Sequence, residues 1–339
     1  MELSKPFFVA EVSGNHNGEL SRALQIVREC AEAGVSAIKL QTYTAETITL
    51  DVDSPQFRIS SNHDLWGSKR LYDLYKEAHT PWEWHSPIFD LAKTLGIQCF
   101  STPFDETAVD FLEELGCPIY KIASMEIVDI PLIVKVAETL KPMIISTGTA
   151  SIGEVSDAVL AARDGGAKDI TLMVCTSSYP AKASEANLAR LDLLKKLFNV
   201  KVGLSDHSLG NAVSISAVAL GAEVIEKHVT LSRSDGGVDS AFSTETGELR
   251  KLLFDLSEAK QAVGVPSNWR TESESESMRL RPSLYFSEDV QPGELVTNSN
   301  VRSVRPSGGL PPVEIRNLLG RRISKLAKKG TPTGWEYFN

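Results

Sequence analysis

Residues 143–176, MIISTGTASIGEVSDAVLAARDGGAKDITLMVCT, contain two short apolar runs on either side of an amphipathic stretch. The runs at 143–147 and 170–176 are rich in Ile, Leu, Val and Met, which is typical of strands buried on both faces. Residues 152–163 repeat apolar side chains every three or four positions, which predicts a helix. A strand, a helix and a second strand in this order predict parallel neighbours joined by a right-handed crossover.

The same unit recurs along the first 265 residues. Its apolar runs lie at 7–11, 35–41, 97–102, 118–123, 143–147, 170–176, 202–205 and 223–228, and further helical stretches lie at 21–33, 131–139 and 188–198. Eight strand–helix repeats in this length predict an α/β protein with a (β/α)₈ TIM barrel. An open, doubly wound sheet is the alternative, and it is disfavoured because no G-x-G-x-x-G motif follows the first strand.

The character of the sequence changes after residue 265. We expect the barrel domain to cover 1–265 and a polar linker to cover 266–282, where residues 271–277 read TESESES. A small β module is expected over 283–339, and a module of this size must lean on the barrel or on a partner subunit to complete its core. Its predicted strands, separated by Gly, Pro and Asn, lie at 284–286, 294–297 and 301–304.

The longest insertion into the repeating pattern follows the second predicted strand. It covers residues 42–81 and carries Trp66, Tyr72 and Tyr75. The loops that follow barrel strands build the face that holds the active site. The insertion is therefore interpreted as a substrate-side excursion with one or more short helices, and a packed surface flap is the alternative.

Charge and hydropathy exclude two classes of protein. The formal net charge is −9, whereas a general nucleic-acid-binding protein normally presents a basic surface. No apolar run approaches the roughly 18 residues of a membrane helix. The N-terminus lacks the features of a signal peptide and the four cysteines are scattered, so we expect a cytoplasmic protein without disulfides. Residues 283–339 carry 8 basic and 5 acidic residues, which favours an anionic ligand or the acidic barrel domain as their partner.

Polar side chains stand where the predicted strands end, and barrel active sites form at the carboxyl ends of the strands. Two lysines and several hydroxyls converging there suit a compact polyanion, such as a small molecule with a phosphate and a carboxylate. For each lysine alone, a solvated strand-end charge is the alternative. The polar residues at these ends include Glu11, Lys39, Gln41, Thr102, Lys121, Ser124, Ser146, Ser205, His207, Glu226 and His228.

Two histidines end consecutive strands. Neighbouring strands lie roughly 5 Å apart, so His207 and His228 are candidates to hold a divalent transition metal that keeps positions open for water and substrate. Simple hydrogen bonding at the barrel mouth is the alternative. Asp206 is expected to orient a neighbouring group or to cap the following helix.

Glu11 ends the first strand and precedes the turn SGNHNG at residues 13–18. A carboxylate in this place is a candidate general base, or a group that orients a water molecule. A structural ion pair with Lys39 or Lys121 is the alternative.

Taken in order, eight segments resemble the family that condenses phosphoenolpyruvate with N-acetylated sugars, the nonulosonic acid or sialic acid-type synthases. The C-terminal residues resemble the antifreeze-like (SAF, β-clip) module appended to those synthases. The barrel segments are AEVSGNHNG (10–18), IKLQTY (38–43), STPF (101–104), YKIAS (120–124), ISTG (145–148), CTSSYP (175–180), GLSDHS (203–208) and EKH (226–228); the C-terminal ones are 287–301, 303–310 and 318–331.

The resemblance implies a role for each matching residue, with Glu11, His207 and His228 as catalytic residues. Phosphoenolpyruvate contacts fall on Lys39, Thr102, Lys121, Ser124, Ser146 and Ser205, and sugar contacts on Gln41, Glu126, Tyr179, Asp239 and Arg305. His207 and His228 are the implied metal ligands, most often for Mn²⁺, with Mg²⁺ or Co²⁺ as substitutes. The resemblance also implies a domain-swapped homodimer in which the antifreeze-like module, carrying Arg305, reaches over the barrel of the other subunit.

Within that family, residues 65–85 and 236–243 look most like the pseudaminic acid synthases. The resemblance implies a transferase that joins phosphoenolpyruvate, water and 2,4-diacetamido-2,4,6-trideoxy-L-altrose into pseudaminic acid, releasing phosphate by C–O cleavage. Sialic and legionaminic acid synthases are the alternatives, although Ser177 stands where the sialic acid synthases have Asn. Another phosphoenolpyruvate-dependent synthase, a metal-dependent aldolase and a non-catalytic carbohydrate- or ice-binding protein are the more distant alternatives.

Overall fold

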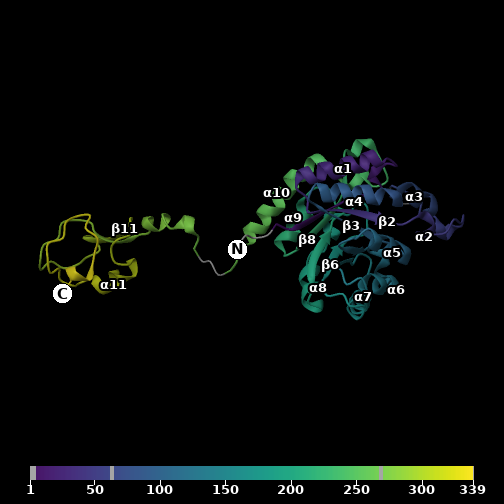
Figure 1. Ribbon diagram of the computed structural model, residues 1–339. Helices are drawn as coiled ribbons and strands as arrows, with labels where there is room; N and C mark the ends of the chain where they lie inside the picture. Colours follow the sequence, from purple (N-terminus) through teal and green to yellow (C-terminus); the bar gives the residue numbers. More distant parts are fainter. Residues whose placement is uncertain (1–4, 62–64, 267–269, 339) are drawn as a thin grey trace. The chain divides into compact units, whose positions relative to one another are not determined.

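The computed structural model describes residues 5–61, 65–266 and 270–338 (Figure 1). The chain divides into two compact units, Met1–Gly264 and Val265–Asn339. Within the described ranges, no helix is both long and apolar enough to cross a membrane.

The first unit is a closed barrel of eight parallel strands, which confirms the predicted fold and rules out the open sheet. β1 pairs with β2 on one side and with β8 on the other, and this second pairing closes the sheet. A short β9 (Thr244–Glu245) extends the end of β8. The barrel strands are β1 Phe7–Glu11, β2 Ala37–Thr42, β3 Gln98–Pro103, β4 Tyr120–Ile122, β5 Met143–Ser146, β6 Ile170–Cys175, β7 Lys201–Ser205 and β8 Val224–Thr230.

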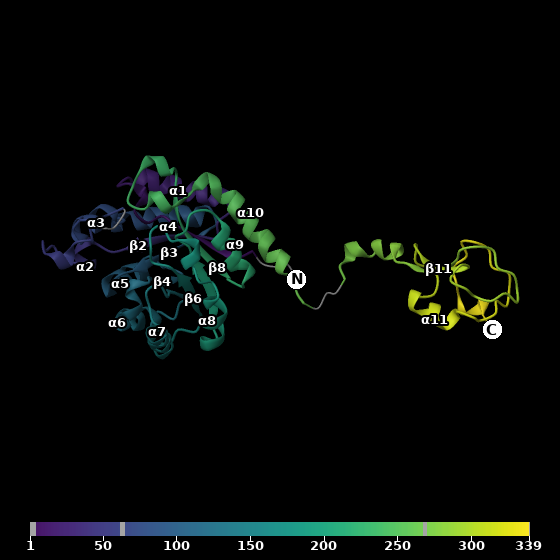
Figure 2. The ribbon, with the colours of Figure 1, turned by 180° about the vertical axis from the view of Figure 1, so that it is seen from behind.

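Helices surround the strands (Figures 1 and 2). Each strand and helix predicted within residues 1–265 overlaps an observed one. Local signals set the helix ends: the Ser151 hydroxyl accepts from the Glu154 backbone at the start of α7, and Gly34 ends α1 at a φ of 95°. The outer helices are α1 Leu20–Ala33, α4 His85–Thr94, α5 Glu106–Glu114, α6 Ile130–Ala137, α7 Ile152–Asp164, α8 Arg190–Phe198, α9 Ala212–Ala219 and α10 Thr246–Val263.

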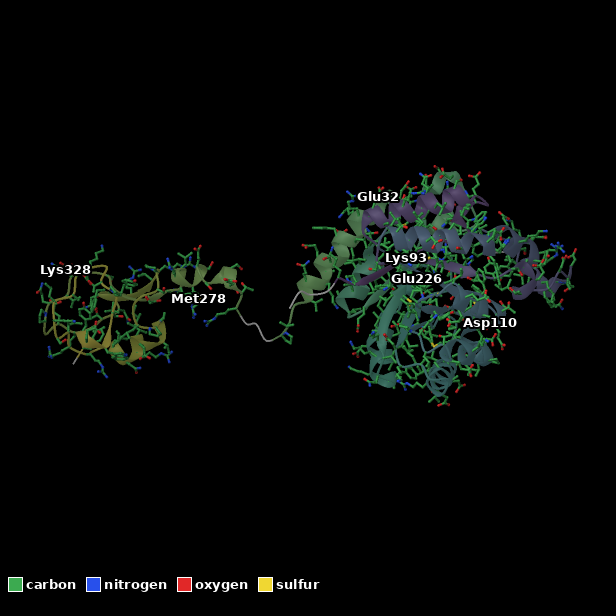
Figure 3. The ribbon with its side chains drawn as sticks, in the orientation of Figure 1. Glu32, Lys93, Asp110, Glu226, Met278 and Lys328 are labelled. Carbon is green, nitrogen blue, oxygen red and sulfur yellow. The ribbon has the colours of Figure 1, made fainter. Side chains whose placement is uncertain are left out.

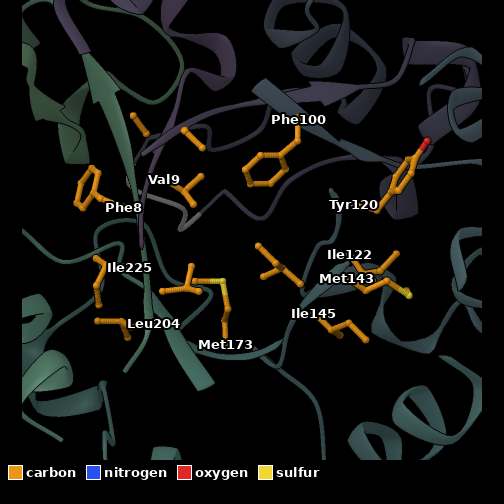
Figure 4. Packing of buried hydrophobic residues seen from close by; sticks show 14 of the residues in the cluster. Phe8, Val9, Phe100, Tyr120, Ile122, Met143, Ile145, Met173, Leu204 and Ile225 are labelled. Carbon is orange, nitrogen blue, oxygen red and sulfur yellow. The ribbon is translucent and has the colours of Figure 1, made fainter. Parts of the chain in front are cut away.

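Apolar side chains fill the space between the strands and the helices and part of the barrel interior. Val9, Met173, Leu204 and Ile225 are buried and come from strands far apart in sequence (Figure 4). Because side chains alternate along a strand, the lysine of β2 faces the barrel interior while its neighbours Ile38 and Leu40 face the helices. The polar residues of the strands therefore face the barrel interior and lie toward the carboxyl ends of the strands.

The insertion after β2 folds as predicted, into short helices. α2 (Ala45–Ile48) and α3 (Leu71–Ala78) are joined by a segment in which Arg58 and Arg70 form an antiparallel bridge. Short 3₁₀ helices occur here and in the other loops of the first unit: η1 Ser13–His16, η2 Pro55–Phe57, η3 Trp82–Trp84, η4 Met125–Val128, η5 Ala183–Glu185, η6 Arg233–Asp235 and η7 Ser240–Phe242.

The second unit has its own small core around Leu284, Phe286 and Leu318. The antiparallel strands β10 (Ser283–Phe286) and β11 (Val301–Val304) match two of the predicted strands. The strand predicted at 294–297 is wrong, because only Leu295 forms a single bridge there. The Asn300 side chain takes up the Leu295 carbonyl and the Thr297 backbone N–H that a strand would need for its ladder.

The remaining elements of this unit are short. Its strands are β10 Ser283–Phe286 and β11 Val301–Val304, and its helices are η8 Glu272–Glu274, η9 Ser277–Leu280, η10 Pro312–Glu314, α11 Ile315–Leu318 and η11 Trp335–Tyr337.

Candidate active site

A cavity of about 480 Å³ opens at the carboxyl ends of the barrel strands. This volume is typical of small-molecule sites. Every barrel residue of the predicted site lines it, so the structure brings together Glu11, Lys39, Gln41, Thr102, Lys121, Ser124, Glu126, Ser146, Tyr179, Ser205, His207, His228 and Asp239. Arg305 belongs to the second unit, and its contact with the sugar stays a prediction.

Two lysines and two carboxylates form a buried network at the floor of the cavity. Lys39 Nζ lies 2.6 Å from Glu11 Oε1 and donates a 3.2 Å hydrogen bond to Thr102 Oγ1. Lys121 Nζ donates to Glu226 Oε1 at 2.8 Å, and Ser205 Oγ donates to the same oxygen at 2.9 Å. Lys39 also lies 3.8 Å from Glu226 Oε2, so the two pairs are joined.

Glu226 is the main residue that the predicted site lacked. The sequence places Glu226 at the end of a predicted strand but assigns it no contact. Alternation along the strand puts it on the same face as His228. Figure 3 shows Glu226 within the barrel, whereas the exposed carboxylates Glu32 and Asp110 lie on its outer side. Glu226 is 1% exposed, and together with Glu11 it offsets the charges of the two lysines at the cavity floor.

Three groups of this network, Glu11, Lys121 and Glu226, have pKa shifts that keep them charged near neutral pH. Burial alone raises the pKa of Glu11, but His228, Lys39 and Lys121 together hold it well below its usual range. Burial alone lowers the pKa of Lys121, but Glu226 and Glu11 together raise it above its usual value. The charge of Lys121 is thus preserved in a buried place where it is available to a bound anion.

Four buried polar atoms around the cavity have no hydrogen-bond partner among the described residues. They are Glu126 Oε2, Ser146 Oγ, Glu226 Oε2 and His228 Nδ1. Buried polar groups in folded proteins normally have partners. Their convergence on one cavity indicates contacts that a bound ligand completes.

The two histidines lie side by side, with ring centroids 5.3 Å apart. His207 Nδ1 donates to the Thr176 carbonyl oxygen at 3.0 Å, which leaves its Nε2 as the free nitrogen. His228 Nε2 lies 3.2 Å from Glu11 Oε2, and its Nδ1 lies 3.8 Å from Asp239 Oδ2. Burial lowers the pKa of His228, which favours the neutral imidazole that binds metals.

The donor set fits an ion that keeps most of its positions open. The part of the chain that the structure describes has no group of three or more His, Cys, Asp or Glu residues arranged to hold a metal. Two imidazoles with Glu11 beside one of them still offer nitrogen and oxygen donors suited to a divalent transition ion. Burial alone lowers the pKa of His207, but the Cys175 thiol raises it above its usual value, and a bound cation would oppose that protonation.

Aromatic and apolar side chains cover the outer part of the cavity. Tyr179 packs against His207 with centroids 4.4 Å apart, and Trp66 packs on Tyr179 at 5.7 Å. The Trp66 indole donates to the Val238 carbonyl oxygen at 2.9 Å, which ties the insertion to the loop after β8. Other insertion residues, among them Leu74, line the same cavity, which favours the predicted substrate-side excursion over a surface flap.

Replacing Glu126 by glutamine should stabilise the protein at pH 8. Burial raises the pKa of this carboxyl from 4.5 to about 7, so its stabilising contribution is complete below pH 4.5 and is lost as the pH rises through 7. At 1.36 kcal/mol per unit of pKa, the ionised carboxylate costs the folded state up to about 3 kcal/mol. Urea unfolding from pH 4 to 8 checks this, with exposed Glu32→Gln as the control; equal stability of Glu126→Gln and the unaltered protein at pH 8 would contradict it.

The chain was compared with known proteins. Residues 26–268 match the NeuB family and residues 281–336 match the SAF domain. A pseudaminic acid synthase of Helicobacter pylori is 41% identical over 331 residues, covering 97% of each chain. An N,N'-diacetyllegionaminic acid synthase of Campylobacter jejuni is 33% identical over 331 residues, covering 96% of this chain and 98% of that protein.

A solved structure supports the same relationship. The N-acetylneuraminic acid synthetase of Leptospira borgpetersenii, determined in complex with citrate, superposes with a TM-score of 0.72 at 32% identity, covering 81% of this chain and 91% of that one. These matches confirm the resemblance found in the sequence. The chain belongs to the NeuB family and carries a SAF domain after its barrel.

Proposed function

We propose that the protein is a pseudaminic acid synthase. It condenses phosphoenolpyruvate, water and 2,4-diacetamido-2,4,6-trideoxy-L-altrose to pseudaminic acid and phosphate. The observation that carries the proposal is the cavity in which two buried lysines, several hydroxyls and two adjacent histidines converge. The 41% identity to a pseudaminic acid synthase favours this acceptor over those of the legionaminic and sialic acid synthases, which are the alternatives.

Phosphoenolpyruvate occupies the floor of the cavity in this proposal. Lys39 and Lys121 supply the positive charge for its phosphate and carboxylate, because compact ammonium groups bind such anions as point charges. The hydroxyls that complete its hydrogen bonds belong to Thr102, Ser124, Ser146 and Ser205. Ser146 Oγ has no partner among the described residues, which supports a ligand contact at that atom.

The reaction joins the enol carbon of phosphoenolpyruvate to the aldehyde carbon of the open-chain sugar. Positive charge then develops at the carbon that bears the phosphate. Glu11, whose low pKa keeps it ionised, orients the water that adds to this carbon, and the two protons of that water go to the new hydroxyl of the sugar and to the leaving phosphate. Phosphate leaves with cleavage of its C–O bond, and the two lysines hold its charge throughout.

The residues His207 and His228 would hold a divalent metal ion, which we propose to be Mn²⁺, with Mg²⁺ or Co²⁺ as substitutes. When bound, such an ion supplies Lewis-acid polarisation of the acceptor carbonyl. Gln41, Glu126, Tyr179 and Asp239 are the proposed polar contacts to the sugar, since all four line the cavity.

Three further parts of the proposal rest on the resemblance. They are the sugar contact of Arg305, the domain-swapped homodimer and the cytoplasmic location. Light scattering of the full chain tests the dimer, and a monomer at micromolar concentration would contradict it.

The decisive experiment is phosphate release from phosphoenolpyruvate with Mn²⁺ and three acceptors offered separately. These are the diacetamido-trideoxy altrose, its manno counterpart that leads to legionaminic acid, and N-acetylmannosamine. Release only with the altrose is expected. Release with another acceptor would keep the chemistry and change the subfamily, whereas no release with any of them, with metal shown to be bound, would refute the proposed function.

A further inference from the structure

The backbone ladder that aligns the two histidine-bearing strands ends before it reaches His207. β7 and β8 are paired in register as far as Ser205 and Glu226, and the Asp206 backbone N–H donates to the Glu226 carbonyl oxygen at 2.8 Å. His228 lies within β8 and remains paired with Glu11 of β1. The sheet therefore positions His228 directly but leaves His207 beyond the last paired residue of its strand.

A buried lysine ties the residues beside His207 to β8, in addition to the backbone hydrogen bond that the Ala181 N–H donates to the His207 carbonyl oxygen at 3.0 Å. Lys227, the residue before His228, donates from Nζ to Asp206 Oδ2 at 2.9 Å and to the Ser208 carbonyl oxygen at 2.9 Å. Asp206 and Ser208 are the two residues that flank His207. One side chain of β8 thus binds both neighbours of the histidine on the adjacent strand end.

The aspartate in this arrangement has a full set of partners. Its Oδ1 accepts from the Ser208 backbone N–H at 2.9 Å and from the Ser208 hydroxyl at 2.6 Å. Its Oδ2 accepts from Ser214 Oγ of α9 at 2.6 Å. The Asp206 and Lys227 side chains are each 1% exposed, and neither residue lines the cavity. Both therefore lie on the helix side of the strands, away from any bound substrate.

We propose that Lys227 and Asp206 are positioning residues that hold the His207 imidazole at its separation from His228. The inference rests on the metal site of the proposed function. A buried ion pair is a weak source of stability, since apolar residues of similar volume usually serve as well or better. The Asp206–Lys227 pair contacts the residues on both sides of one proposed metal ligand. Positioning that ligand therefore explains the pair better than a contribution to stability does.

The test is the double variant Asp206→Asn/Lys227→Met. Lys227→Met alone would leave Asp206 as an unpaired buried charge and would be strongly destabilising, whereas the double variant removes both charges. Binding of Mn²⁺ alone to the purified full-length protein is followed by electron paramagnetic resonance, and thermal unfolding is followed by circular dichroism. The Mn²⁺ dissociation constant should rise about 10- to 100-fold, as for other residues that orient metal ligands, while the unfolding temperature stays close to that of the unaltered protein.

A partly exposed ion pair outside the cavity supplies the control. Lys141 and Glu113 form a 2.5 Å pair outside the cavity, and Glu113→Gln/Lys141→Met should leave the Mn²⁺ dissociation constant unchanged. Should the double variant fail to fold, Lys227→Arg keeps the charge beside Asp206 but changes the contacts to Asp206 and to the Ser208 carbonyl oxygen, and it should weaken Mn²⁺ binding about tenfold.

The outcomes separate this inference from the proposed function. Mn²⁺ binding by the unaltered protein, with equal affinity in a folded double variant, overturns the positioning role and leaves the metal site intact. No Mn²⁺ binding by the unaltered protein overturns the metal site itself, and the positioning role with it. Weaker binding at unchanged unfolding temperature supports the inference, because a purely structural ion pair would alter stability rather than metal affinity.

Discussion

Replacing His207 by alanine is expected to abolish phosphate release from phosphoenolpyruvate while the barrel stays folded. The imidazole is one of two nitrogen donors for the proposed metal. Among the described residues, no group of three or more His, Cys, Asp or Glu side chains is arranged to hold the ion in its place. A catalytic metal supplies several kcal/mol of charge stabilisation, so the turnover number should fall by at least about 10³-fold. Phosphate release, Mn²⁺ binding and thermal unfolding measured on the same preparation check this.

The control for this variant is His79→Ala. His79 lies on the insertion but does not line the cavity, so its loss should change turnover little. Full activity of His207→Ala after thorough removal of metal would show that the two histidines are not metal ligands in this protein.

The second large effect is expected for Lys121→Met. This variant removes one of the two buried positive charges at the cavity floor and leaves Glu226 facing the incoming anion. Loss of one such charged contact costs on the order of 10²- to 10³-fold in rate, so kcat/KM for phosphoenolpyruvate should fall by that factor. The KM for the acceptor sugar should change far less, because the proposed sugar contacts are separate residues. Steady-state kinetics with each substrate varied in turn separates the two parameters.

A second variant separates the loss of anion binding from the effect of leaving Glu226 as a buried carboxylate without its lysine. Lys121→Met/Glu226→Gln removes both partners of the 2.8 Å pair, so it should recover thermal stability without recovering phosphoenolpyruvate binding. Lys141→Met, outside the cavity, serves as the matched lysine control. An unaltered KM and kcat for phosphoenolpyruvate in the double variant would place the phosphate elsewhere.

The barrel could be predicted because its signals are local and repeated. Each strand is a short apolar run, and each helix carries its own periodicity and ends, such as the Ser151 cap and Gly34. The strand expected at 294–297 failed for the opposite reason. Apolar residues there looked like a strand, but the Asn300 side chain binds two of the backbone groups of that segment. The partner of a backbone group depends on the tertiary structure.

The site shows the same division. Polar residue types at the ends of successive strands indicated a phosphate-binding cavity with a two-histidine centre, because parallel strands in a barrel bring their carboxyl ends to one face. The sequence does not predict that Glu226 pairs with Lys121, nor that Lys227 binds both neighbours of His207. A partner for either side chain is chosen by the pairing of β8 with its neighbours, which no spacing along the chain reveals.

The order of strands and helices, the polarity of each strand end and the resemblance to the NeuB family could therefore be established from the amino-acid sequence. Periodicity and residue type are properties of short segments, so they can be recognised without knowledge of the fold. Closure of the barrel decided the rest. It placed Glu11 of the first strand 3.2 Å from His228 of the last, and it set which lysine meets which carboxylate, because contacts between distant segments depend on how the sheet closes.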